Sequence, residues 1–256
     1  MRILASPTAG GARTEDGRTP GRPAPCGNGH GGHVAAGDGE GFPVVALGIA
    51  NVGKSTTLSA FAGDRSVFAA RDVPRATRSL AVHRAGPLLL VDTPGLDADA
   101  QDTRLALGAC AGAGIVLFCH SLRMGELRPR EIEALRAYAG SSELFRRTCF
   151  VLTHADDLAD DTIARTVSEV IADQLRSVFR VPFVAPGAPY AVLPDGAPPP
   201  RRLKMVANDR YWRAQALNGP AGRALAEMSG VPALRRLLLQ IAERRAGRTE
   251  RRQVHP

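Results

Sequence analysis

A lysine and a serine end a short loop with the pattern Gly-Ile-Ala-Asn-Val-Gly-Lys-Ser at residues 48–55. Gly48 and Gly53 allow the backbone to wrap so that successive N–H groups point inward, toward an anion. Lys54 places a compact charge on terminal phosphates, and Ser55 offers a hydroxyl to the magnesium that bridges them. Because an apolar run precedes this loop and a helix-forming run follows it, we expect it to cradle a nucleoside triphosphate. The predicted contact residues are Gly48, Asn51, Gly53, Lys54, Ser55 and Thr56.

Lysine is rare in this chain, so its presence in the loop is informative. Of the 33 lysine and arginine residues, only Lys54 and Lys204 are lysines, and the other 31 are arginines. An ammonium group fits between phosphate oxygens where a planar guanidinium does not. An ordinary glycine-rich turn would not require this choice, which favours phosphate binding.

A second cluster follows the apolar run Leu88–Val91, in the tetrapeptide Asp-Thr-Pro-Gly. Asp92 is expected to hold a magnesium-bound water at the end of a strand, and the N–H of Gly95 can approach the terminal phosphate. As an isolated peptide this is simply a good turn, but its place after a buried strand favours the functional interpretation. Thr77 lies in the loop between the first predicted helix and the second predicted strand, and it is expected to complete magnesium coordination. The predicted magnesium ligands are Ser55, Thr77 and Asp92.

A third cluster, Thr153-His154-Ala155-Asp156, also follows an apolar run. Asp156 can accept hydrogen bonds from N1–H and the exocyclic amine of guanine, whereas adenine presents a lone pair at N1. Two charge-assisted hydrogen bonds favour guanine by about 3–6 kcal/mol. His154 would then stack on the base. The competing interpretation is that Asp156 only caps the helix that follows.

Together, these clusters resemble the motifs of the translation-factor-class GTPases. Within that class the chain is similar to the immune-associated and chloroplast-import-receptor (Toc-type, septin-like) GTPases, of which the Thr-His-x-Asp form is distinctive. The resemblance covers roughly residues 43–185. It implies an α/β fold, a three-layer P-loop G domain with a mostly parallel central sheet and helices on both faces. It also implies GTP and GDP as ligands and Mg²⁺ as cofactor. For the fifth, base-contacting motif the candidates are residues 185–187 and Asn208.

The resemblance implies hydrolysis of GTP to GDP and phosphate, with Lys54 and Thr77 as catalytic residues. Leu96 stands where many small GTPases carry a glutamine that orients the attacking water. We therefore expect slow GTP turnover and a role as a nucleotide switch. Homodimerisation or a partner would accelerate hydrolysis, through an arginine such as Arg75 or Arg78. The alternatives are a GTP-binding dimerisation module that does not hydrolyse and an ATP-using phosphate-loop enzyme.

Alternating short apolar runs and amphipathic segments support a parallel sheet covered on both sides. The predicted strands are Val44–Ile49, Ala81–Arg84, Leu88–Val91, Ile115–Cys119, Cys149–Leu152 and Val181–Val184. The predicted helices are Lys54–Ala62, Thr103–Ala111, Pro129–Tyr138, residues 163–178 and a last one starting near Pro232.

The domain boundaries follow from composition. With 256 residues, 44% of them hydrophobic, the chain suits one G domain at residues 42–246 with tails. Residues 1–41 are rich in Gly, Pro and Arg and are expected to be disordered. An irregular insertion is expected at about 187–225, and residues 247–256 form a basic tail.

The positive charge is concentrated near the C-terminus. Residues 201–256 contain 13 basic and four acidic groups, whereas residues 1–200 contain 20 and 21. This distribution argues against specific nucleic-acid binding and favours a local surface for an acidic partner or an anionic membrane. The last helix has an apolar face formed by Leu234, Leu237, Leu238 and Ile241, which we expect to pack on the sheet.

The sequence carries no apolar run long enough to cross a bilayer and no secretory signal. Its four cysteines have no disulfide or zinc spacing. We therefore expect reduced thiols and an intracellular protein, cytoplasmic or associated with an organelle.

Overall fold

A computed structural model describes residues 41–68, 80–97, 99–139, 142–158, 160–186 and 201–253. The predicted N-terminal tail, apart from its last residue, lies outside these ranges. Within them, the secondary structure alternates between strands and helices, as the pattern of apolar runs predicts. The elements that follow therefore belong to the predicted G domain and the segment after it.

The main sheet contains six strands in the described part of the chain, in the order β2-β3-β1-β4-β5-β8. β2 and β3 form an antiparallel hairpin, and the other neighbouring pairs are parallel. This mostly parallel sheet confirms the predicted fold class. The strands are β1 (Phe42–Leu47), β2 (Ala81–Ala85), β3 (Leu88–Asp92), β4 (Ile115–Ser121), β5 (Thr148–Thr153) and β8 (Lys204–Met205).

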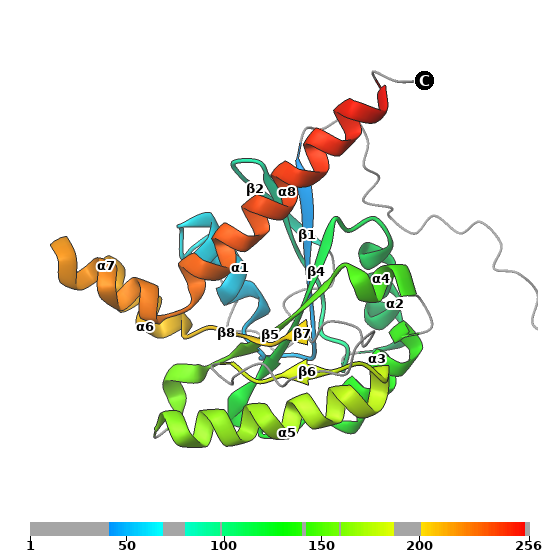
Figure 1. Cartoon of the computed structure of the whole chain (residues 1–256), viewed down its shortest axis with the longest axis horizontal. Coiled ribbons are helices and arrows are strands. Elements are labelled where there is room, and N and C mark those ends of the chain that lie inside the picture. The colour runs from blue at the N-terminus through cyan, green and yellow to red at the C-terminus, as the bar shows by residue number, and fades with distance from the viewer. Residues whose placement is uncertain are drawn as a thin grey trace, which may run out of the picture. The chain divides into compact units, whose positions relative to one another are not determined.

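Helices cover the sheet in two groups (Figure 1). On one side α1 contacts α8 and α6, and on the other α3 contacts α4 and α5. The longer helices are α1 (Lys54–Ala62), α2 (Ala100–Ala111), α3 (Pro129–Ala139), α5 (Asp161–Phe179), α6 (Asn208–Gln215), α7 (Gly219–Met228) and α8 (Val231–Gln253). Shorter helical segments are η1 (Leu122–Met124), α4 (Ser142–Arg146) and η2 (Ala155–Asp157).

Strand register brings the predicted clusters to one edge of the sheet. Ala46 of β1 is paired with Asp92 of β3, so the loops that follow these two strands start side by side. At the next pair, Ser121 of β4 is opposite Thr153 of β5. Since β1 also pairs in parallel with β4, all four carboxyl ends face the same way.

Two predictions for the C-terminal part are wrong. Residues 201–225 are not irregular, because they include β8, α6 and part of α7. The predicted strand at 181–184 is only β6 (Phe183–Val184), which pairs with β7 (Arg201–Arg202) outside the main sheet. The last strand of the main sheet is instead β8, and directly after it Val206 N donates to Leu152 O. Two-residue strands carry too little hydrophobic periodicity to be predicted from the sequence.

The predicted apolar face of α8 is confirmed. Leu234 and Leu238 are buried in the core, and Leu237 and Ile241 are half-buried. Among the described residues, the cysteines are all free: Cys110, Cys119 and Cys149. Burial raises the pKa of the Cys110 thiol to about 12, which keeps it protonated. No helix in the described ranges combines the length and apolarity needed to span a bilayer.

Candidate functional site

The loop between β1 and α1 wraps around the ammonium group of its own lysine. Lys54 Nζ donates to Gly48 O at 3.1 Å and to Ile49 O at 2.7 Å. Only glycine fits at position 48, because a Cβ there would lie 2.4 Å from the carbonyl oxygen of Cys119. Burial lowers the pKa of Lys54, while the nearby charge of Asp92 opposes this shift. A phosphate would supply the anionic partner that the two carbonyls only partly replace.

Ser55 and Asp92 connect this loop to the end of β3. Ser55 Oγ donates to Asp92 Oδ2 at 2.6 Å. Asp92 is 3% exposed, and its other oxygen, Oδ1, has no hydrogen-bond partner. Burial raises the pKa of Asp92, while the hydrogen bond from Ser55 lowers it. A buried carboxylate that has one oxygen without a hydrogen-bond partner and lies next to a hydroxyl is suited to hold a magnesium ion with its bound water.

The segment after β3 packs directly against the phosphate loop. Leu96 N donates to Gly48 O at 3.2 Å. A Cβ at Gly95 would be 2.7 Å from Ala50 N, so only glycine permits this approach. Ala50 N donates to Asp97 Oδ1 at 2.6 Å. The Gly95 backbone therefore lies beside the loop, and Asp97, which the motif analysis missed, contacts the loop as well.

The end of β5 is tied to the phosphate loop from the opposite side. Thr153 Oγ1 donates to Val52 O at 2.6 Å. His154 has a left-handed backbone, with φ of 56°, and its Nδ1 lies 2.9 Å from Ser121 Oγ. Burial lowers the pKa of His154, which favours a neutral ring. Ser121 was not predicted, although a polar residue ending the apolar run of β4 could have indicated it.

Asp156 is held by the helix that follows β8. Asp156 Oδ2 accepts from Arg210 N at 2.9 Å. Asn208, at the start of the same helix, donates from Nδ2 to Thr57 Oγ1 at 2.9 Å, and its Oδ1 is buried without a partner. Of the two candidates for the fifth motif, Asn208 therefore has an unused acceptor on the helix that contacts Asp156. Asp156 does not cap α5, whose N-cap is Asp160.

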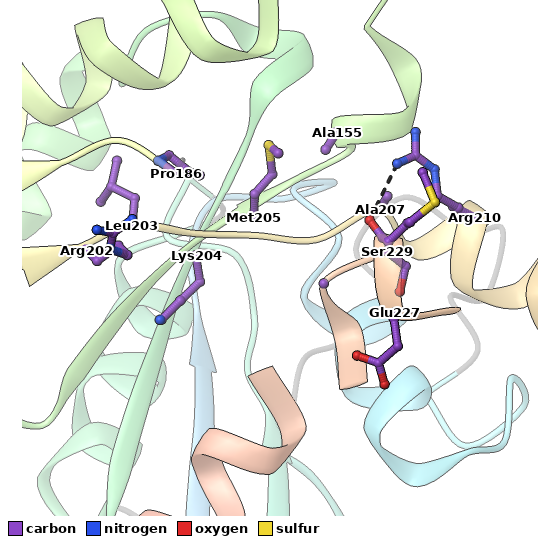
Figure 2. A pocket seen from close by; sticks show the side chains of 12 residues that line it. Ala155, Pro186, Arg202, Leu203, Lys204, Met205, Ala207, Arg210, Glu227 and Ser229 are labelled. Carbon is purple, nitrogen blue, oxygen red and sulfur yellow. Dashed lines mark hydrogen bonds between the residues drawn. The ribbon is translucent and has the colours of Figure 1, made fainter. Parts of the chain in front are cut away.

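A cavity of about 290 Å³ lies beside Asp156, between β8 and the turn from α7 to α8. Figure 2 shows Ala155 and Arg210 among the residues that line it, with Lys204 and Met205 projecting to opposite sides of β8. Pro186, which belongs to the other candidate segment for the fifth motif (residues 185–187), also lines this cavity. The cavity is not lined by any residue from Gly48 to Ser55, so it is distinct from the phosphate loop.

The structure brings most of the predicted site residues together. Gly48, Gly53, Lys54, Ser55, Asp92, Gly95, Thr153, His154 and Asp156 lie on loops linked by the contacts above. Asn51 and Thr56 are exposed residues of the same loop and the start of α1. Thr77, Arg75 and Arg78 lie outside the described residues.

Comparison with known proteins agrees with this architecture. Residues 43–154 match the family model described as 50S ribosome-binding GTPase. An uncharacterised protein of Acinetobacter baylyi is 38% identical over 136 residues, which are 52% of this chain and 32% of the relative. The chain thus spans about a third of the length of this curated relative.

Solved structures show the same fold. Toc33 from Arabidopsis thaliana in complex with Mg²⁺ and GMPPNP superposes with a TM-score of 0.54 at 17% identity, covering 80% of this chain and 85% of Toc33. Its complex with GDP and Mg²⁺ gives 0.51 at 17% identity, over 79% and 84% of the two chains. The fold and the motif-bearing loops define a P-loop nucleotide-binding domain. Residues 43–154 thus resemble a family of GTPases, and the fold is similar to that of Toc33.

Proposed function

We propose that this protein binds GTP and GDP with Mg²⁺ and hydrolyses GTP slowly as a nucleotide switch. The observation that carries the proposal is the meeting of three sequence-distant loops at one sheet edge. Ser55 joins the phosphate loop to Asp92 of β3, and Thr153 joins it to the end of β5. The matching family of GTPases and the nucleotide complexes of Toc33 support the same ligands.

Phosphate binding is assigned to the loop between β1 and α1. Lys54 would exchange its two carbonyl partners for phosphate oxygens and stabilise the charge that develops on them during hydrolysis. Magnesium, held through Ser55 and Asp92, would neutralise the β and γ oxygens. The unpartnered Oδ1 of Asp92 is the acceptor available for this role.

Guanine recognition is assigned to the end of β5 and the start of α6. Asp156 keeps one oxygen for the N1–H and amine edge, while its other oxygen is fixed by the Arg210 N–H. Asn208 has a buried acceptor without a partner and lies on the same helix. His154 would lie against the base, in line with its contact to Ser121.

Slow turnover follows from the residue after Gly95. Leu96 is 6% exposed, and its aliphatic side chain cannot orient water. Homodimerisation or another partner would then accelerate hydrolysis, with Arg75 and Arg78 as the arginines to test. The switch would work through the segment after Gly95, because it contacts the phosphate loop directly.

The basic C-terminal region is assigned to an acidic partner or an anionic membrane surface. Arg244 and Arg245 are exposed on α8, whereas Leu234 and Leu238 of the same helix are buried. The apolar face thus packs inward and leaves arginines on the outside. Salt-sensitive binding to anionic vesicles, lost in Arg244→Glu/Arg245→Glu, would support this assignment.

Base choice gives the sharpest test. Asp156→Asn replaces an acceptor by an amide, which pairs with the C2 carbonyl of xanthine. We expect GTP affinity to fall by about 100-fold and xanthosine triphosphate to become the preferred ligand. Titration calorimetry with GTP, ATP and xanthosine triphosphate measures both changes.

The matched control is Asp157→Asn. Asp157 is the neighbouring carboxylate, and it pairs with Arg123 at 3.2 Å, whereas Asp156 accepts from Arg210 N. The control should retain the preference for GTP. An unchanged base preference in Asp156→Asn, or tight ATP binding by the wild type, would remove the guanine assignment. Single-turnover decay of bound GTP then separates a slow GTPase from a module that does not hydrolyse.

A further inference from the structure

The carboxylate of Asp97 occupies an N–H group of the phosphate loop. Its Oδ1 accepts from Ala50 N at 2.6 Å. The backbone of the same segment is fixed on both sides of this contact. Leu96 N donates to Gly48 O at 3.2 Å, and Arg130 Nη1 donates to Asp97 O at 3.0 Å. The segment is therefore docked on the loop at two points and held by α3 at a third.

This contact lies next to the backbone of Gly95. A Cβ at Gly95 would be 2.7 Å from Ala50 N and 2.7 Å from Asp97 Oδ1. Gly95 is the residue whose N–H we expect to approach the third phosphate. Backbone N–H groups of such loops bind anions, and here the anion is a side chain of the protein itself.

The carboxylate is not required to start the following helix. The N-cap of α2 is Asp99, whose side chain accepts from Gln101 N and Asp102 N. Asp97 lies two residues earlier, and its contact runs 47 residues back along the chain. A purely local structural role therefore belongs to Asp99 and leaves the Asp97 contact unexplained.

We propose that Asp97 determines the preference of this site between GDP and GTP. The carboxylate and a third phosphate are both anions that need the Ala50 N–H, so they exclude each other. GDP leaves the contact intact, whereas GTP must displace it and thereby loosens the segment after Gly95, which keeps its contact to Gly48 O. Nucleotide state and the position of this segment are coupled through that exchange. The inference rests on the proposed function.

The test compares GDP with the triphosphate analogue GMPPNP, both with Mg²⁺, by titration calorimetry. Asp97→Ala should bind GMPPNP about five- to tenfold more tightly than the wild type, since removing a competing charged acceptor is worth about one tenfold step. GDP affinity should change by less than about twofold. Asp97→Asn, which keeps an acceptor but loses the charge, should fall in between.

Two further variants separate this competition from general charge effects. Glu133→Ala removes an exposed carboxylate from α3 and should leave both affinities unchanged. Arg130→Ala removes the donor to the Asp97 carbonyl and should favour GMPPNP in the same direction, by a smaller factor.

An unchanged ratio of the two affinities in Asp97→Ala would overturn the inference. If single-turnover hydrolysis were slower while this ratio stayed unchanged, Asp97 would instead be assigned to positioning water. If the wild type binds neither nucleotide, the proposed function fails together with this inference. If it binds both and the ratio does not respond, only the role of Asp97 is lost.

Discussion

The two halves of the candidate site are built differently. The phosphate half consists of one continuous loop after β1 and the end of the adjacent strand β3, joined by Ser55 and Asp92. The base half combines the ends of β4 and β5 with the start of α6, and Asp156 is fixed by an N–H group 54 residues further along the chain. Phosphates can be held by consecutive N–H groups, whereas the edge of a base needs groups from several directions.

The largest effect should come from the phosphate half. Lys54→Ala removes the charge at the centre of the loop and should weaken GDP and GTP binding by more than about 100-fold, because each charged hydrogen bond contributes about 1.5–3 kcal/mol. Lys204→Ala is the matched control, since Lys204 is the other lysine of the chain and lines the separate cavity. Equal losses in both variants would contradict the phosphate assignment.

An intermediate effect is expected in the base half. Asn208→Ala removes both the donor to Thr57 and the unpartnered acceptor, so we expect about tenfold weaker GTP binding. Thr57→Val removes only the hydroxyl partner. It should lower the free energy of unfolding by about 1 kcal/mol and affect GTP affinity less. Similar losses of affinity in the two variants would mean that Asn208 acts only through packing; calorimetry and urea unfolding measure the two quantities.

The smallest effect is a pH dependence of stability at His154. Burial lowers its pKa from the usual 6.5, so between the two values the unfolded chain binds more protons than the folded protein. The stabilisation that the neutral His154 ring contributes is therefore fully present above pH 6.5. It is lost as the pH falls from 6.5 through the lowered pKa. Urea unfolding at about pH 7.5 and about pH 5.5 should show a smaller loss in His154→Gln than in the wild type. An identical loss in both proteins would assign the effect to other groups.

The comparison of halves also describes what could be predicted. Gly48, Lys54 and Ser55 were identifiable because a phosphate loop carries its signature in adjacent residues, and Asp92 because it follows a buried apolar strand. Asn208 remained one of two candidates, because the strand before it is too short to show a period. Asp97 could not be assigned to a contact, since no local pattern places its carboxylate near Ala50.

The sequence by itself determined the strands β1 to β5, the helices α1, α2, α3, α5 and α8, and the three motifs in the loops that follow β1, β3 and β5. These depend on periodicity and on residue types that are close together in the chain. Only the tertiary structure decided that β8 closes the sheet, that α6 contacts both Asp156 and Thr57, and that Asp97 contacts the phosphate loop. Such contacts depend on how separate elements pack, and the residues that make them have no neighbours in the sequence that reveal the contact.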